Sequence, residues 1–135
     1  MIMNSLQGLP DFLIYIATSI GLCALFLVAY TKVTPNHEFD LIFNEHNQTA
    51  AVAVGMSLLG FSLPLASAIY NSAHIIDCVV WGLVALVCQL IAYFLAYISH
   101  PNLGESIRNN VLSAGLWVGF VSLATGLLSA ASMTY

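Results

Sequence analysis

The sequence predicts an all-α polytopic membrane protein in which four transmembrane helices form two tandem helical hairpins, as a parallel internal repeat. Four stretches of about 20 residues have no interior charge, at 12–31, 49–70, 79–99 and 111–133. A helix of that length spans the ~30 Å hydrocarbon core of a bilayer. Composition agrees, because 60% of the residues are hydrophobic and only 6% are charged. The second pair of stretches also resembles the first.

The first stretch, 12–31, is expected to be a retained transmembrane helix and not a removable signal peptide. Asp11 stands where a signal peptide carries Lys or Arg, and the apolar run continues to Lys32 without a clear small-x-small cleavage site. The chain is therefore expected to keep its first helix in the bilayer.

The following loop is the most polar part of the chain. Thr34 is a plausible N-cap for a short amphipathic helix that lies in the membrane interface. The loop is interpreted either as a solvated connector or as a docking site for a cytoplasmic protein partner. The residues expected to meet such a partner are Pro35, Glu38, Phe39, Phe43 and Glu45.

Proline interrupts the second stretch, 49–70, about two thirds along its length. Pro64 has no N–H, so it removes a backbone hydrogen bond and frees a carbonyl near Gly60. A helix kink is expected there. It either shapes the packing permanently or acts as a gating hinge.

The third stretch, 79–99, carries Gln89 near its middle, the only amide at that depth. An unpaired amide is costly in hydrocarbon, so Gln89 is expected to bond to a neighbouring helix or to line a wet pore. No Asp, Glu, Lys or Arg lies inside any of the four stretches. This argues against proton-coupled pumps and voltage sensors, which normally use such residues.

The fourth stretch, 111–133, has a stripe of small residues that includes Gly115, Gly119 and Gly126. Small residues four apart allow close approach of two membrane helices. The stripe is expected to pack within the protomer against Gly55 and Gly60, or alternatively between protomers.

The two halves of the chain match one another within a single membrane domain, 1–135. Repeat one covers 12–71 and repeat two covers 79–135. Ala17, Leu22, Ala24, Ala50, Gly55 and Leu59 recur as Ala85, Leu90, Ala92, Ala114, Gly119 and Leu123. Two helices per unit imply a parallel repeat.

The two basic residues, Lys32 and Arg108, lie in the first and third connections. The positive-inside rule therefore places both of these loops in the cytoplasm and both termini in the periplasm. A net charge of −4 without a basic cluster argues against nucleic-acid binding.

No residue pattern predicts catalysis, a metal site or a cofactor. His37, Glu38, Glu45 and His46 do not have the spacing of an established metal site. Cys23, Cys78 and Cys88 form no CxxC pair. The protein is therefore expected not to be an enzyme.

One set of residues resembles the YjfL family of bacterial inner-membrane proteins (domain of unknown function 350) over essentially the whole chain. The set includes Thr34-Pro35, Asn47, Thr49-Ala50-Ala51, Gly55, Gly60, Pro64-Leu65, Trp81-Gly82, Gln89-Leu90, Asn110, Gly115, Gly119 and the end Ala130–Tyr135. Ser129 departs from the pattern, in which Asn is expected.

The resemblance implies a four-helix inner-membrane protein without an assigned activity. Genes of this family often lie near those for membrane-stress proteins, which favours a role in an envelope-maintenance complex. We therefore expect a non-enzymatic, homo-oligomeric scaffold or subunit in the bilayer. The alternative is an oligomeric channel or small-solute transporter that needs several copies, with Gln89 lining its pore.

Overall fold

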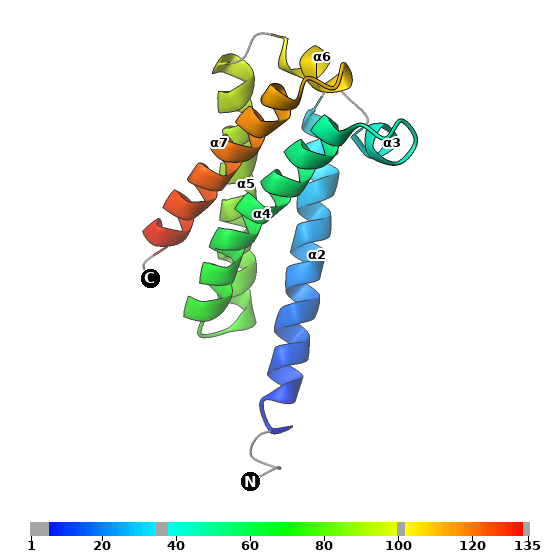
Figure 1. Cartoon of the computed structure of the whole chain (residues 1–135). Coiled ribbons are helices and arrows are strands. Elements are labelled where there is room, and N and C mark those ends of the chain that lie inside the picture. Colours follow the sequence, from blue (N-terminus) through cyan, green and yellow to red (C-terminus); the bar gives the residue numbers. More distant parts are fainter. Residues whose placement is uncertain (1–5, 35–37, 100–101, 134–135) are drawn as a thin grey trace.

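The computed structural model is all-helical and describes residues 6–34, 38–99 and 102–133 (Figure 1). Four of its helices are long and apolar enough to cross a membrane. They are α2 (Leu9–Val33), α4 (Gln48–Asn71), α5 (Ile75–Ser99) and α7 (Leu112–Ser132). Two short helices, α3 (Glu38–Phe43) and α6 (Leu103–Arg108), connect α2 to α4 and α5 to α7.

The ends of the long helices follow local chemistry. α2 starts earlier than expected because Pro10 fits a first helical turn, where its missing N–H costs nothing. α5 begins at Ile75 because Asp77 is favourable in a first turn, where the helix dipole attracts a carboxylate. Thr34 ends α2, with its N–H bonded to the Tyr30 carbonyl. Its expected role as the cap of a following helix depends on residues 35–37, which lie outside the described residues.

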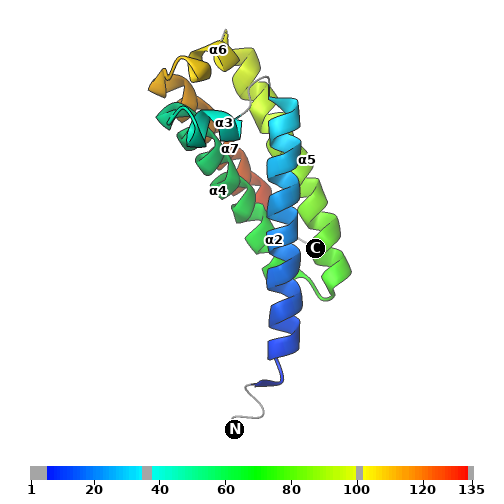
Figure 2. The same ribbon diagram turned by 90° about the vertical axis from the view of Figure 1, so that its right-hand side faces the viewer.

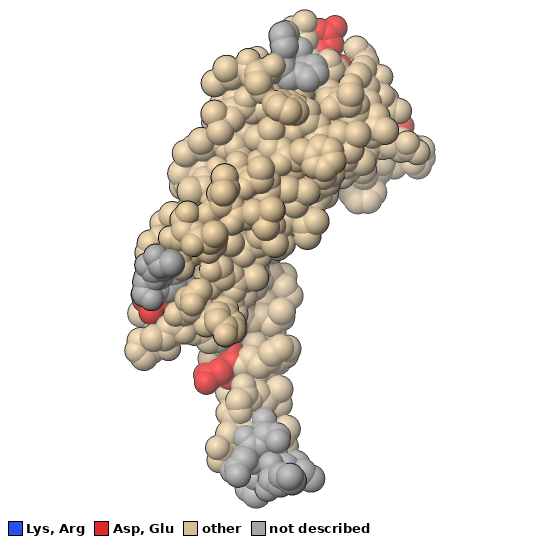
Figure 3. Space-filling model, turned by 60° about the vertical axis from the view of Figure 1, so that its left-hand side comes forward, with Lys and Arg blue, Asp and Glu red and all other residues tan. Residues whose placement is uncertain are grey.

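The short helices α3 and α6 lie at one end of the bundle, whereas α2 begins and α7 ends toward the other (Figures 1 and 2). The chain therefore passes the length of the bundle four times, as the four apolar stretches predict. Figure 3 shows a continuous uncharged surface between carboxylates near the two ends. This surface matches the hydrocarbon part of a membrane.

The most extensive helix contact joins α4 to α7, and therefore crosses between the two halves of the chain. α5 packs against both of them. α2 is the most peripheral span, because 17% of its most apolar stretch is buried, against 44% in α4. Membrane helices present apolar side chains on all sides, so a peripheral helix can face lipid at no cost.

Aromatic side chains hold α2 against the other helices. The Phe26 ring stacks on Phe61 of α4 with centroids 4.8 Å apart, and Tyr30 meets the ring of Tyr93 of α5 edge-on at 5.5 Å. Phe26, Tyr30 and Phe61 are each no more than 1% exposed. These aromatic contacts anchor the second half of α2, and the Ser72 hydroxyl donates to the Tyr15 hydroxyl of its first half at 3.0 Å.

Candidate functional site

A buried polar cluster lies where α4, α5 and α7 meet. Ser57, Gln89 and Ser122 come from these three helices, and each is 1% exposed. The two serine hydroxyls lie 3.2 Å apart. Because membrane-buried polar groups are costly unless they are paired, this cluster is the first place to look for function.

The Gln89 side-chain amide bridges two backbone groups of α7. With its amide oriented to suit its neighbours, the nitrogen donates to the Ser122 carbonyl at 3.3 Å and the oxygen accepts from the Gly126 N–H at 3.2 Å. Ser122 and Gly126 are four residues apart, so these two groups are also the partners of one α-helical hydrogen bond. Gln89 therefore ties α5 to one turn of α7.

Glycines allow α4 and α7 to come this close to one another and to Gln89. A Cβ at Gly60 would lie 2.5 Å from the Ser122 carbonyl oxygen and 3.2 Å from the Gln89 side chain. A Cβ at Gly126 would overlap the Gly60 carbonyl oxygen. Pro64, inside α4 and buried, cannot donate the usual hydrogen bond to that carbonyl. The helix continues through Pro64, and its expected kink remains a prediction.

The small-residue stripe of α7 faces α4 along much of its length. Gly115 lies against Thr49, where a Cβ would be 2.6 Å from the carbonyl oxygen, and Gly119 lies against Met56, where it would be 2.6 Å from the sulfur. Gly55, which was expected to share this contact, is exposed and has no atom within 4 Å of its position for a Cβ. Thr49 and Met56, and not Gly55, are the residues of α4 that meet Gly115 and Gly119 of α7.

A second polar cluster joins the two halves at the α3–α6 end. The Asn47 amide nitrogen donates to the carbonyls of Ile107 and Arg108 at 2.8 and 3.2 Å, and its oxygen caps α4 by accepting from the Ala50 N–H. The Asn110 oxygen accepts from both the N–H and the hydroxyl of Thr49, at 3.1 and 2.7 Å.

Sequence reasoning gave these cap residues no role. Asn before an apolar run is an N-cap signal, so the local role of Asn47 could have been found. No sequence signal indicates that Asn110 caps a helix of the other half.

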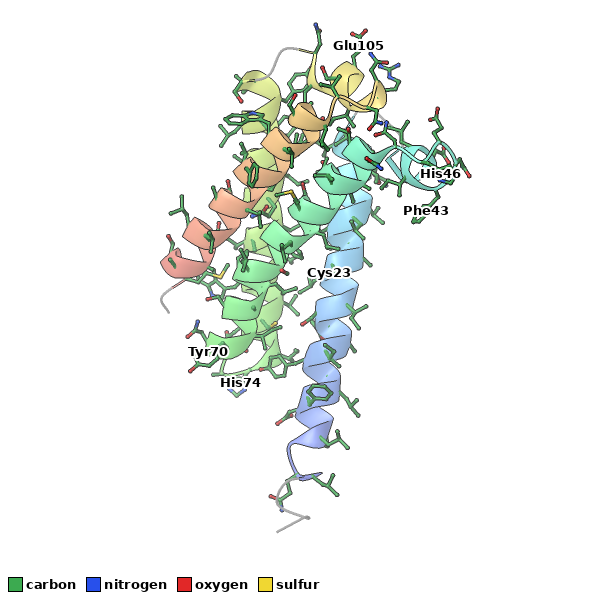
Figure 4. The ribbon with its side chains drawn as sticks, in the orientation of Figure 1. Cys23, Phe43, His46, Tyr70, His74 and Glu105 are labelled. Atoms are coloured by element: carbon green, nitrogen blue, oxygen red, sulfur yellow. The ribbon has the colours of Figure 1, made fainter. Side chains whose placement is uncertain are left out.

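The residues of the first polar loop differ in how exposed they are. Leu41 of α3 is buried against the bundle, whereas Phe43 is 69% exposed and points outward (Figure 4). Glu45 is exposed. Pro35 and the side chains of Glu38 and Phe39 lie outside the described residues.

Among the described residues no group of three or more His, Cys, Asp or Glu side chains could hold a metal ion. The described hydroxyls of the central cluster are paired with one another, and no base lies among them. Chemically, the arrangement offers hydrogen bonds that join helices.

Described residues line three cavities at the edges of the bundle. One, about 350 Å³, is a mainly apolar groove between α5 and α7, lined by residues that include Trp81, Cys88 and Met133. A second, about 300 Å³, lies beside Lys32 and Tyr97. A third, about 240 Å³, lies beside Asp11 and His74 at the opposite end. Gln89 lines none of these three.

Comparison with known proteins identifies the family. The family model "Domain of Unknown Function (DUF350)" matches residues 3–133. The chain is 38% identical over 133 residues to the UPF0719 inner membrane protein YjfL of Escherichia coli (strain K12), covering 98% of this chain and 100% of that protein. The same values hold for the YjfL protein of Escherichia coli O157:H7. No solved structure matches.

The chain belongs to the DUF350 family, as the resemblance in its sequence predicted. An inner-membrane relative and four apolar helices together support a multi-pass inner-membrane location.

Proposed function

We propose that this member of the DUF350 family is a non-enzymatic, oligomeric scaffold or subunit of an envelope-maintenance complex in the inner membrane. The observation that carries the proposal is that the central polar cluster is buried and makes its hydrogen bonds within the bundle. Gln89, Ser57 and Ser122 are buried and bonded within the bundle, which leaves none of them facing a solute pathway. The polar side chains of the core therefore serve to join helices.

Oligomerisation is proposed through the outer face of α4. Ala51, Gly55 and Ala66 are exposed there, and the space beside Gly55 is open. In lipid, helices associate where small residues let their backbones approach, since the bilayer supplies no hydrophobic drive between them. A second copy is the partner that this face suits.

The α3 loop is the proposed contact for a cytoplasmic protein partner. Lys32 and Arg108 flank the two loops at one end of the bundle, so the positive-inside rule favours that end as cytoplasmic and both termini as periplasmic. Phe43 offers an exposed ring beside the acidic Glu45. A complementary partner surface would be apolar and basic.

We also propose that the halves arose by duplication. Each half runs from a long helix through a short one to a second long helix. His46 and Asn110 both adopt a positive φ, 55° and 60°, one residue before the N-cap of α4 and of α7 respectively. A left-handed residue is uncommon outside glycine, so its recurrence at matching places supports a common ancestor.

The channel alternative requires Gln89 to leave its contacts with α7 or to face a lumen between protomers. It is tested by ion and solute flux in proteoliposomes. We expect flux equal to that of empty liposomes for the wild type and for Gln89→Leu. Flux that exceeds the empty control and falls with Gln89→Leu would establish the channel and overturn the scaffold proposal.

Oligomerisation is tested separately by subunit counting in nanodiscs. Gly55→Leu is expected to abolish the oligomer. Gly21→Leu is the matched control, because Gly21 of α2 is also exposed with open space around it. If Gly21→Leu abolished the oligomer and Gly55→Leu did not, the subunit contact would lie on α2 and the proposed face of α4 would be refuted.

A further inference from the structure

The cavity beside Lys32 has the composition of a lipid-headgroup site. It measures about 300 Å³ and is lined by the last residues of α2 and the last turns of α5: Lys32, Val33, Thr34, Tyr93, Phe94 and Tyr97. It lies at the end of both spans, which is the depth at which a bilayer places its headgroups.

Lys32 gives this cavity a positive charge that none of the described carboxylates balances. It is one of only two basic residues in the chain. No ion pair joins it to a described carboxylate, and none of the described residues that line the cavity is acidic. The described carboxylates at this end of the molecule, Asp40 of α3, Glu45 and Glu105 of α6, are not among the lining residues.

The walls of the cavity are fixed and amphipathic. Tyr93 is 2% exposed, and its ring contacts Tyr30, Phe94 and Tyr97 at centroid distances of 5.5, 6.1 and 6.4 Å. Tyr97 and Phe94 are half-exposed, so they can border a lipid. Tyrosine suits this depth because its ring is apolar and its hydroxyl is polar.

We propose that this cavity binds the phosphate of an anionic phospholipid, with Lys32 as the charge partner. The Tyr97 hydroxyl is placed to donate a hydrogen bond to a headgroup oxygen, while Val33 and Phe94 border the start of an acyl chain. An anionic headgroup is favoured over a zwitterionic one because the described lining offers an amine no carboxylate to pair with. The site is independent of the oligomeric interface proposed on α4.

Native mass spectrometry of the full chain, released from membranes into detergent, tests this assignment with added phosphatidylglycerol or phosphatidylcholine. The wild type is expected to retain phosphatidylglycerol preferentially. Lys32→Gln should lower this retention about fivefold, the effect of one cation near a membrane surface. Lys32→Arg should preserve it, and Tyr97→Phe should lower it by a smaller factor.

Arg108→Gln is the matched control, because it removes one positive charge at the same end of the molecule but not in the cavity. It is expected to change retention less than twofold. Equal losses for the two variants would mean general surface attraction and overturn the site. Equal retention of phosphatidylcholine, or displacement of the lipid by inorganic phosphate, would overturn its assignment to an anionic phospholipid.

Discussion

The carbonyl oxygen of Gly60 lies against Gly126, at a place where no side chain fits between α4 and α7. Pro64 leaves that carbonyl without its usual donor in α4, and the absent Cβ of Gly126 lets α7 close over it. Gln89 then bonds to the same turn of α7 from the third helix. One proline, two glycines and one amide together set the geometry of the bundle centre.

Gly126→Ala should destabilise the fold by about 1–3 kcal/mol, because the added methyl overlaps the Gly60 backbone and forces the helices apart. The measurement is reversible unfolding in mixed micelles. Gly21→Ala is the control, since nothing lies within 4 Å of its new methyl and Gly21 is outside the oligomer contact proposed on α4. Equal effects of the two substitutions would refute the close contact.

Gln89→Leu should lower stability by about 1 kcal/mol, the usual scale of an interhelical hydrogen bond in a membrane protein. Leucine has a size similar to that of glutamine, but it can make neither of the two hydrogen bonds to α7. The same unfolding assay applies, with Val87→Leu on the exposed side of α5 as the control. A Gln89→Leu protein as stable as the wild type would show that the bridge contributes nothing.

Asn110→Gly should cost about 1–2 kcal/mol, because the N–H and hydroxyl of Thr49 lose their acceptor. Glycine keeps the positive φ of 60° without strain, so the loss reports on the hydrogen bonds. Asn110→Asp retains the acceptor oxygen and should stay within about 0.5 kcal/mol of the wild type. Equal losses for both variants would mean that the acceptor is not what matters.

Phe26→Ala should loosen α2, which is the least buried of the four spans. Its ring stacks on Phe61, and such a pair contributes about 0.5–1.5 kcal/mol beyond its buried area. Spin labels at Ile20 and Ile91, both exposed, should report a broader distance distribution in the variant. Phe12→Ala, at a site that is 60% exposed, should leave the distribution unchanged.

Much of the fold follows from hydrophobic length alone. All four spans were predicted, and each observed helix overlaps its expected stretch. The glycines of the fourth stretch were expected to pack against the second helix or between protomers, and Gly115, Gly119 and Gly126 lie against α4. The first loop was expected to hold a short helix, whereas the short helix α6 in the third connection was not anticipated.

The rotation of α4 about its axis could not be predicted. Small residues lie on two of its faces: Ala53, Ser57 and Gly60 are buried, whereas Ala51, Gly55 and Ala66 are exposed. In a soluble helix, polarity would separate these faces, but lipid accepts apolar residues on either side. The cap between Asn110 and Thr49 was also beyond prediction, since it joins residues 61 positions apart.

The most direct test of the scaffold account is the structure of the assembly in lipid nanodiscs, determined by electron microscopy. The account predicts a closed oligomer with Gly55 at the subunit contact, Gln89 buried against α7 and an axis filled by apolar side chains or lipid. A continuous polar lumen that reaches Gln89 would contradict it and establish the channel instead.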